Sequence, residues 1–486
     1  MRKNQNSPSP PRSGGEGRGE GVSNAEIRLQ RPLTLTLSPT CVGARECLGG
    51  HLRAMFAVIV ALIFIAPLSA QAFGAKQVSF AKGSDVWFAE DHTLPMIALV
   101  AAFPAGSVYD PQDRDGLASF AASMLDEGAG KLDSKAFHTA LADKAIQLSV
   151  DTDRDWMVVS LVTLSTNAKE AMRLLGTALA HPRFDADAVA RVRAQMLQNI
   201  NQQDEDPAQV AARNFHLVYF GAHPYAHPTD GDGPGLTAIK QADLKNFAAT
   251  HWVRSGLKIA VAGDIDAAAL AGLLKSTFGP LRAAAPPSPP QNMRRGAPGL
   301  HVFAMDVPQP NAVFALPGML RNDKDFLPAY VANYILGGGG FSSRLTADVR
   351  EKRGLTYDIS TDLATLKHAG LIEGTVATRS NAVTQTLAQV KDTMAKFAAD
   401  GPTPQELADA KTYLTGAYPL SFSSNAGTAS QLSVFQRSGL PIGYVAKRNA
   451  MIDAITLDDV KRVAKKWFDP KRLTVVVAGT IKDQKH

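Results

Sequence analysis

The chain has 486 residues, of which 45% are hydrophobic and 20% are charged, and its formal net charge is +6. This length exceeds one ordinary hydrophobic core, so we expect a soluble protein of two or more domains. Residues 1–72 hold eight Lys or Arg and four Asp or Glu, which leaves 43 basic and 41 acidic residues for 73–486. This nearly even balance of basic and acidic residues argues against a surface that binds nucleic acid or an anionic membrane.

The first segment in chain order has the composition of a leader. Residues 1–54 are rich in Gly, Ser, Pro and Arg and show no sustained apolar periodicity, so they cannot bury a core. We expect them to be disordered, or to lie upstream of a true start near Leu52 or Met55. Both cysteines, Cys41 and Cys47, fall here, so the mature chain would have no disulfide, thiolate zinc site or cysteine nucleophile.

Residues 55–72 have the pattern of a secretory signal peptide. The apolar run Met55–Ala66 follows Arg53 and precedes the sequence Ala70-Gln71-Ala72, an Ala-x-Ala cleavage pattern. The run is shorter than the roughly 20 residues that a spanning helix needs. The sequence therefore predicts cleavage after Ala72 and a periplasmic location. The alternative is a membrane anchor formed by the uncleaved segment.

The remainder of the chain repeats itself. Leu257–Ile265 corresponds to Leu473–Ile481, and Ile239–Ala248 corresponds to Ile455–Ala464 at the same spacing in sequence. Two copies of about 200 residues indicate a duplicated domain, because solenoid repeats have periods of about 20–50 residues.

A Pro-rich segment separates the two copies. It begins at Ala283 and contains the sequence Pro-Pro-Ser-Pro-Pro, which is typical of a stiff, extended linker. We therefore predict an N-terminal domain at 76–282, a linker at 283–297 and a C-terminal domain at 298–483.

Each copy mixes strand-like and helical patterns. Leu117, Phe120, Ala121, Met124 and Leu125 recur at helical spacing, and 189–200 is similar. This mixture predicts an α+β fold in which each half is a mainly antiparallel sheet with helices packed on one face. The predicted strands are Pro95–Phe103, Trp156–Leu164, Leu257–Ala262, Ala312–Leu316 and Leu473–Ala478.

The helix around Leu117 resembles one that carries a metal site in a known family. The segment Gly-Leu-Ala-Ser-Phe-Ala-Ala-Ser-Met-Leu and its surroundings are similar to zinc peptidases of the pitrilysin/insulinase family, such as the mitochondrial processing peptidases. Their inverted motif His-x-x-Glu-His supplies two zinc ligands and a general base. The matching positions here are Ser119, Ala122 and Ser123, and the family's third ligand aligns with Asn199. None of these side chains can hold zinc or act as a base near neutral pH. The resemblance therefore implies a peptidase-like domain that has lost its zinc site and binds no cofactor.

Other histidines do not replace the lost site. His223 and His227 are four residues apart, but prolines interrupt the helix that would align them, and the family uses a similar His-Pro-Tyr loop structurally. Asp126 and Glu127 form a carboxyl pair without a nearby imidazole in the sequence. The other histidines that follow the leader lack ligand spacing, which is more typical of surface or core residues. They are His92, His138, His181, His216, His251, His301, His368 and His486.

The second half keeps the motif that the family uses against substrate. Gly337–Gly340 is followed by a predicted helix from Phe341 to Lys352, which Gly354 would terminate. The resemblance implies that Arg350 and Tyr357, at the family spacing of seven, bind substrate and stabilise the oxyanion. Without the family, Arg350 would be an ordinary solvated cation and Tyr357 a half-buried strand residue.

These observations predict a non-catalytic subunit of a heteromeric zinc peptidase. The resemblance implies that a partner chain with His-x-x-Glu-His supplies the zinc, and that this chain contributes Arg350 and Tyr357 to cleavage of peptides or unfolded segments. The main alternative is an inert structural or peptide-binding core protein of the same fold. A serine hydrolase built on Ser119 or Ser123 is disfavoured because neither residue lies in a Gly-x-Ser-x-Gly motif.

Overall fold

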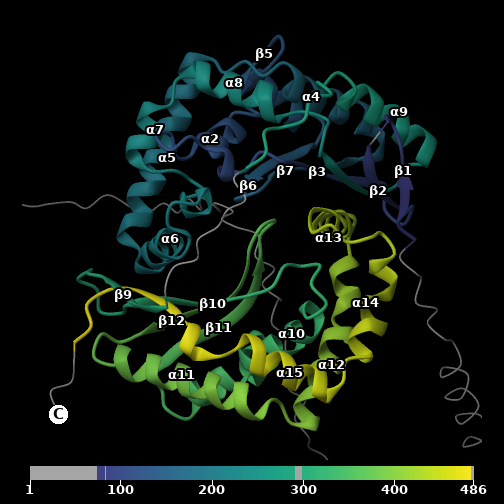
Figure 1. Ribbon diagram of the computed structural model, residues 1–486. Helices are drawn as coiled ribbons and strands as arrows, with labels where there is room; N and C mark the ends of the chain where they lie inside the picture. The colour runs from purple at the N-terminus through teal and green to yellow at the C-terminus, as the bar shows by residue number, and fades with distance from the viewer. Residues whose placement is uncertain (1–73, 83, 290–297, 483–486) are drawn as a thin grey trace, which may run out of the picture. The chain divides into compact units, whose positions relative to one another are not determined.

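The structure is a computed structural model that describes residues 74–82, 84–289 and 298–482 (Figure 1). The predicted leader, the signal peptide and residues 290–297 of the predicted linker lie outside the described residues. Residues 283–289 form neither helix nor strand, as their proline content predicts.

The first half is built on a mixed sheet with the strand order β1-β2-β8-β3-β7-β6. All its pairings are antiparallel except that of β2 with β8. Its strands are β1 (Lys76–Val78), β2 (Asp85–Glu90), β3 (Met96–Phe103), β6 (Gln147–Thr152), β7 (Met157–Leu164) and β8 (Lys258–Gly263). A short hairpin of β4 (Gly128–Ala129) and β5 (Leu132–Asp133) lies apart from this sheet.

The second half has a sheet with the order β11-β12-β10-β13-β9, in which only β13 and β9 are parallel. Its strands are β9 (Gly299–Phe303), β10 (Asn311–Pro317), β11 (Thr356–Thr365), β12 (Gly370–Thr378) and β13 (Thr474–Ala478). The predicted α+β class is thereby confirmed, with a mainly antiparallel sheet in each half.

Helices of each half cover one face of its own sheet and enclose a hydrophobic core. The helices of the first half are α2 (Leu117–Ser123), α3 (Ser134–Ala142), α4 (Ala168–Ala180), α5 (Ala186–Glu205), α6 (Pro207–Phe220), α7 (Gly233–Ala238), α8 (Gln241–His251) and α9 (Ala267–Phe278). Those of the second half are α10 (Phe326–Asn333), α11 (Val383–Asp400), α12 (Pro404–Gly416), α13 (Asn425–Arg437), α14 (Tyr444–Asp453) and α15 (Leu457–Trp467).

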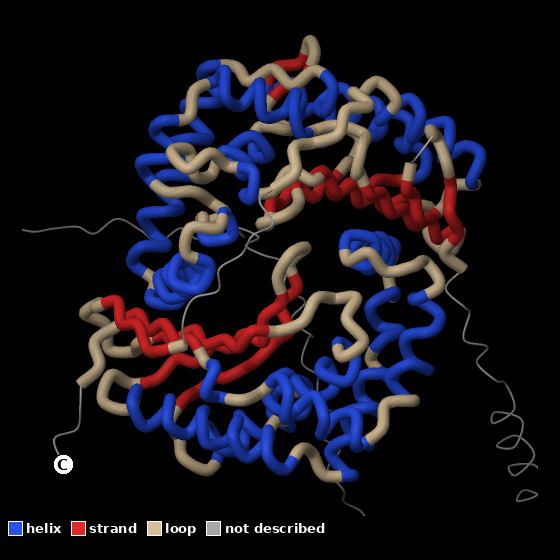
Figure 2. Tube along the Cα trace, viewed as in Figure 1, coloured by secondary structure: helices blue, strands red, loops and turns tan. Residues whose placement is uncertain are grey.

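The opposite face of each sheet is covered by a helix from the other half. Leu432 and Phe435 of α13 pack against the first sheet at Trp87 and Val100. Conversely, α6 packs against β10 and β13 of the second sheet (Figures 1 and 2). A buried side chain of the size of Phe435 contributes about 1.5–3 kcal/mol, so the exchanged helices stabilise both halves together.

Polar contacts fix α13 at both ends. The Asn425 side chain donates to the Met96 carbonyl at 3.0 Å, and the Arg437 guanidinium lies 2.9 Å from Asp153. The exchange explains why β3 and β8 are apolar on both faces, which the sequence shows as continuous runs rather than alternation.

The repeat found in the sequence is visible in the elements. Helix α8 and helix α15 each have 11 residues and each precede a central strand, β8 or β13. The five predicted strands occur as β3, β7, β8, β10 and β13, with ends that shift by one residue. Among the described residues, no helix is both long and apolar enough to cross a membrane.

Candidate functional site

Helix α2 is held at its beginning by a buried carboxylate. Gly116 has φ of 93°, which ends the preceding turn, and Asp110 accepts hydrogen bonds from the Gly116 and Ala118 amides at 2.9 and 2.8 Å. Burial raises the pKa of Asp110 to about 7, despite these two hydrogen bonds. Next to it, His227 and Asp115 form an ion pair at 2.5 Å that ties the His-Pro-Tyr loop to this helix.

The positions that match the zinc motif do not form a metal site. Ser119 and Ser123 lie on one face of α2, where the Ser123 hydroxyl donates to the Ser119 carbonyl at 2.9 Å, and Ala122 is buried. Asn199 lies on the neighbouring helix α5, exposed, and accepts from Gln195 at 3.0 Å. Hydroxyl, methyl and carboxamide groups lack the imidazole and carboxylate donors that zinc requires, so these residues do not fit the ion.

In the structure, a histidine side chain lies close to Asp126 and Glu127. The spacing of residues in the sequence did not reveal this contact. His138, from α3, lies with its Nε2 atom 3.2 Å from Asp126, and within the described residues this is the one His/Asp/Glu group close enough to hold a metal ion. The spacing in sequence indicated only a surface or core residue at His138; the side chain is exposed, and the fold places it next to Asp126. Glu127 is already engaged, since Arg191 contacts both its oxygens and Ser134 donates to it at 2.6 Å.

The electrostatics of this group favour an ion-pair network. Burial opposes ionisation of Glu127, but its hydrogen bonds from Arg191 and Ser134 outweigh this effect and hold its pKa below the usual value. A charged guanidinium on Glu127 competes directly with a cation. We therefore assign the group the role of joining the ends of α2, α3 and α5.

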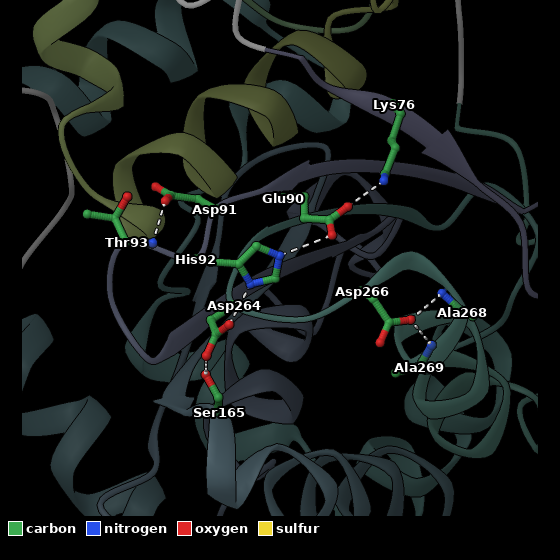
Figure 3. A network of polar contacts seen from close by, with 10 residues as sticks. All are labelled: Lys76, Glu90, Asp91, His92, Thr93, Ser165, Asp264, Asp266, Ala268 and Ala269. Carbon is green, nitrogen blue, oxygen red and sulfur yellow. Dashed lines mark hydrogen bonds and ion pairs between the residues drawn. The ribbon is translucent and has the colours of Figure 1, made fainter.

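A second histidine network lies where strands β2 and β8 of the first sheet end (Figure 3). His92 contacts Asp264 at 2.6 Å through Nδ1 and Glu90 at 3.1 Å through Nε2, and Ser165 donates to Asp264 at 2.7 Å. The hydrogen bonds that His92 makes to Asp264, and then to Glu90, raise the pKa of His92. The serine bonds to the carboxylate rather than to the imidazole, so this arrangement does not activate a nucleophile. Its role is to join β2 to the end of β8.

The histidines of the His-Pro-Tyr loop have separate structural contacts. The Nδ1 atom of His223 accepts from the Tyr225 amide at 3.1 Å and caps the following turn, whereas His227 pairs with Asp115. The Tyr225 hydroxyl donates to Asp155 at 2.6 Å, and Asp155 also accepts from the Lys367 amide of the β11–β12 hairpin. This loop therefore helps to join the two halves.

The Gly-rich segment packs against strand β11. A Cβ atom at Gly337 would lie 2.3 Å from the Thr361 hydroxyl, and the Asn333 side chain donates to the Thr361 carbonyl at 2.9 Å. Residues Tyr334–Gly338 form a π-helical turn, closed by the Gly339 amide on the Tyr334 carbonyl at 2.8 Å. The glycines thus permit a close approach of this segment to β11.

The predicted helix from Phe341 to Lys352 is present but is not a regular α-helix. Its main part, Thr346–Glu351, is π-helical: the Lys352 amide donates to the Ala347 carbonyl. Because the Lys352 amide bonds to Ala347, the Asp348 carbonyl loses its regular helical partner. It accepts instead from the Arg353 guanidinium at 2.8 Å. Single π-helical turns are frequent at functional sites.

The end of this segment is as predicted. Gly354 has φ of 60°, and its amide donates to the Arg350 carbonyl at 2.8 Å, so a glycine closes the turn. The segment is also anchored laterally, because the Arg344 guanidinium makes two hydrogen bonds of 2.7 Å to Glu406 of α12.

Arg350 and Tyr357 both reach the surface but do not touch each other. The Arg350 guanidinium lies 4.5 Å from the centre of the Phe341 ring, and that ring is 61% exposed. Tyr357 is 81% exposed. It is therefore not the half-buried strand residue that would be expected without the family resemblance. The phenol is available as a hydrogen-bond donor, and the guanidinium as a set of donors.

The helix that carries Ser119, Ala122 and Ser123 lies beside an edge strand of the first sheet, and Tyr357 lies on an edge strand of the second. Helix α2 packs against β6, the outermost strand of the first sheet, and Tyr357 lies on β11, the outermost strand of the second.

Two stretches of the chain match peptidase families: residues 86–233 match "Insulinase (Peptidase family M16)" and residues 238–414 match "Peptidase M16 inactive domain". The chain belongs to the M16 insulinase family. The resemblance seen in the sequence is thereby confirmed.

Two of the similar M16 proteins carry names that indicate lost activity, whereas others are named as proteases or peptidase subunits. The crystal structure of a peptidase M16 inactive domain from Pseudomonas fluorescens is 30% identical, with a TM-score of 0.80, over 85% of this chain and 99% of that chain. "Non-peptidase homolog YmxG" of Helicobacter pylori is 27% identical over 86% of this chain and 96% of its own. The mitochondrial-processing peptidase subunit beta of Blastocladiella emersonii is 21% identical over 78% of this chain and 82% of its own.

Proposed function

We propose that this M16 chain is the non-catalytic subunit of a heteromeric zinc peptidase. In this proposal a partner chain with His-x-x-Glu-His supplies the zinc ion, the water and the general base. This chain supplies Arg350 to hold the substrate backbone and Tyr357 to donate to the oxyanion at the scissile carbonyl. Its substrates are peptides or unfolded segments.

The observation that carries the proposal is the contrast between α2 and β11. The donor set on α2 does not fit zinc, whereas the exposed phenol of Tyr357 and the Arg350 segment are held by specific contacts. A structural protein has no need of an 81% exposed tyrosine held in this way. A phenol aimed at a developing oxyanion in an enclosed site contributes about 3 kcal/mol to transition-state stabilisation.

The outer strand β6 supports the choice of an extended peptide as substrate. Its residues alternate between the core and the solvent, and Gln147, Ser149 and Asp151 are exposed. A strand at the edge of a sheet offers unpaired backbone groups to an added strand. A bound peptide would therefore lie beside the helix on which active members carry zinc.

We also propose that the chain works outside the cytoplasm. The support is the signal-like run Met55–Ala66 followed by Ala70-Gln71-Ala72. A tagged protein should appear in the periplasmic fraction with its N-terminus at Phe73. Retention of the tag in membranes, with an uncleaved N-terminus, would favour the anchor instead.

The test of the function is hydrolysis of a quenched-fluorescent unfolded peptide by mixtures with a His-x-x-Glu-His chain from the same genome. Tyr357→Phe should lower kcat of the mixture by about 100-fold, since one oxyanion donor is worth that much. Tyr413→Phe is the matched control, because Tyr413 is 42% exposed on α12 and has no proposed role. Equal losses in the two variants would remove the oxyanion role.

The second candidate is an inert peptide-binding or structural protein, which the name of the Helicobacter pylori relative favours. It predicts that no mixture hydrolyses the peptide, although the partner chain is folded and holds zinc. Binding of the same peptide by this chain alone would then identify a peptide-binding protein.

A further inference from the structure

Strand β11 is irregular at the residue proposed to act on substrate. From Ile359 onward its side chains alternate, with Thr361 and Leu363 buried and the residues between them exposed. Continued backward, this alternation would bury Tyr357 and expose Thr356. The structure shows the reverse: Tyr357 is exposed and Thr356 is 6% exposed.

A β-bulge causes the reversal. Thr356 pairs with Thr378, whereas Ile359 pairs with Val376, so three steps along β11 match two along β12. The extra residue turns Tyr357 and Asp358 to the same side of the sheet. Bulges commonly redirect a side chain next to a functional site.

One hydroxyl group holds this bulge. Thr356 Oγ1 lies 2.6 Å from the Ala377 carbonyl and 2.7 Å from the Asp358 carbonyl, and it accepts from the Asp358 amide at 3.1 Å. It thereby satisfies backbone groups that the bulge removes from regular pairing with β12. A side chain without a hydroxyl would leave these partly buried groups without this partner.

A second hydroxyl ties the same place to the core. Thr378 Oγ1 donates to the Leu355 carbonyl at 2.5 Å and lies 3.0 Å from the Thr386 hydroxyl of α11. The start of β11 is therefore fixed to β12 and to a helix behind it. This support makes the bulge a defined structure rather than a loose strand end.

We propose that Thr356 is the positioning residue for Tyr357: its hydroxyl holds the bulge that directs the phenol out of the sheet. The link to catalysis rests on the proposed function, whereas the control of Tyr357 by Thr356 does not. Thr356→Val keeps the shape and the β-branch but removes the hydroxyl. The strand then gains most by returning to regular pairing, which turns Tyr357 toward the core.

The test compares Thr356→Val with Thr356→Ser in the full chain, using 3-fluorotyrosine at position 357 and hydrogen exchange at the Asp358 amide. Thr356→Val should shift the fluorine resonance and raise amide exchange about tenfold, as expected for one lost hydrogen bond. Thr356→Ser should restore both values. If Thr356→Val does not fold, Thr356→Ala gives the same comparison against Thr356→Ser.

The two proposals fail separately. A fluorine resonance and an exchange rate that are unchanged without the hydroxyl would overturn the positioning role, whatever the mixtures do. In active mixtures, Thr356→Val should lower kcat with little change in KM and Thr356→Ser should recover it. Mixtures that are inactive even with the native chain would refute the peptidase proposal, and the fluorine and exchange data would still decide the role of Thr356.

Discussion

Asp325 anchors the helix that leads into the Gly-rich segment, and its replacement by Asn should be costly. The side chain is fully buried and accepts from Arg462 at 2.7 Å, Lys466 at 2.7 Å and the Trp467 indole at 3.1 Å. Burial disfavours the ionised carboxylate, but the hydrogen bonds from Lys466, Arg462 and Trp467 outweigh it and hold the pKa of Asp325 well below its usual value.

The cost follows from these contacts. A hydrogen bond to a charged group contributes about 1.5–3 kcal/mol, and Asp325→Asn removes the charge from three of them. Arg462 and Lys466 are 47% and 53% exposed, so water replaces part of what they lose. We expect Asp325→Asn to lower the free energy of unfolding at pH 7 by about 2–3 kcal/mol.

Urea unfolding, with hydrogen exchange at α10 and α15, measures this effect. The matched control is Asp392→Asn, which removes the charge from an exposed pair with Lys396 at 2.8 Å and should cost much less, because water screens exposed charges. The difference in the free energy of unfolding between the wild type and Asp325→Asn should decrease as the pH drops below about 4, because the carboxylate of the unfolded chain then becomes protonated. Equal costs for the two variants, or a difference that is the same at pH 3 and pH 7, would refute this reasoning.

Three further changes test other parts of the structure. Gly337→Ala places a Cβ 2.3 Å from the Thr361 hydroxyl and should lower the melting temperature, whereas Gly416→Ala, with open space around it, should not. Burial raises the pKa of Asp110 to about 7, so stability should fall as the pH rises from about 4 to 7, and Asp110→Asn should flatten that profile in urea titrations. Burial opposes ionisation of Glu406, but its hydrogen bonds from Arg344 hold its pKa at about 2. The stability it contributes should be complete above about pH 4.5 and lost toward pH 2, and Glu406→Gln should remove this acid dependence.

The sequence predicted the features that depend on local pattern. The apolar runs identified five strands, and the internal repeat identified corresponding helices such as α8 and α15, because burial dictates both patterns. The glycine that ends the segment at Gly354 was also predictable, since its positive φ excludes most other residues.

Features that depend on contacts distant in sequence were not predictable. In the sequence, the only sign of the exchange of α6 and α13 between the halves is that the covered strands are continuously apolar. Strands buried in other ways have the same pattern. His138 comes to Asp126 because α3 folds back, which residue spacing does not encode. The exposure of Tyr357 depends on the bulge, and the polar residue Thr356 in a strand pattern was its only signal.

The proposed function requires two different chains for one peptidase activity. The most direct measurement varies the mole fraction of this chain and a His-x-x-Glu-His chain at constant total concentration and records the hydrolysis of an unfolded peptide. We predict little activity at either end and a maximum at equal amounts of the two chains. Activity that rises in proportion to this chain alone, or that is independent of it, would contradict the proposed function.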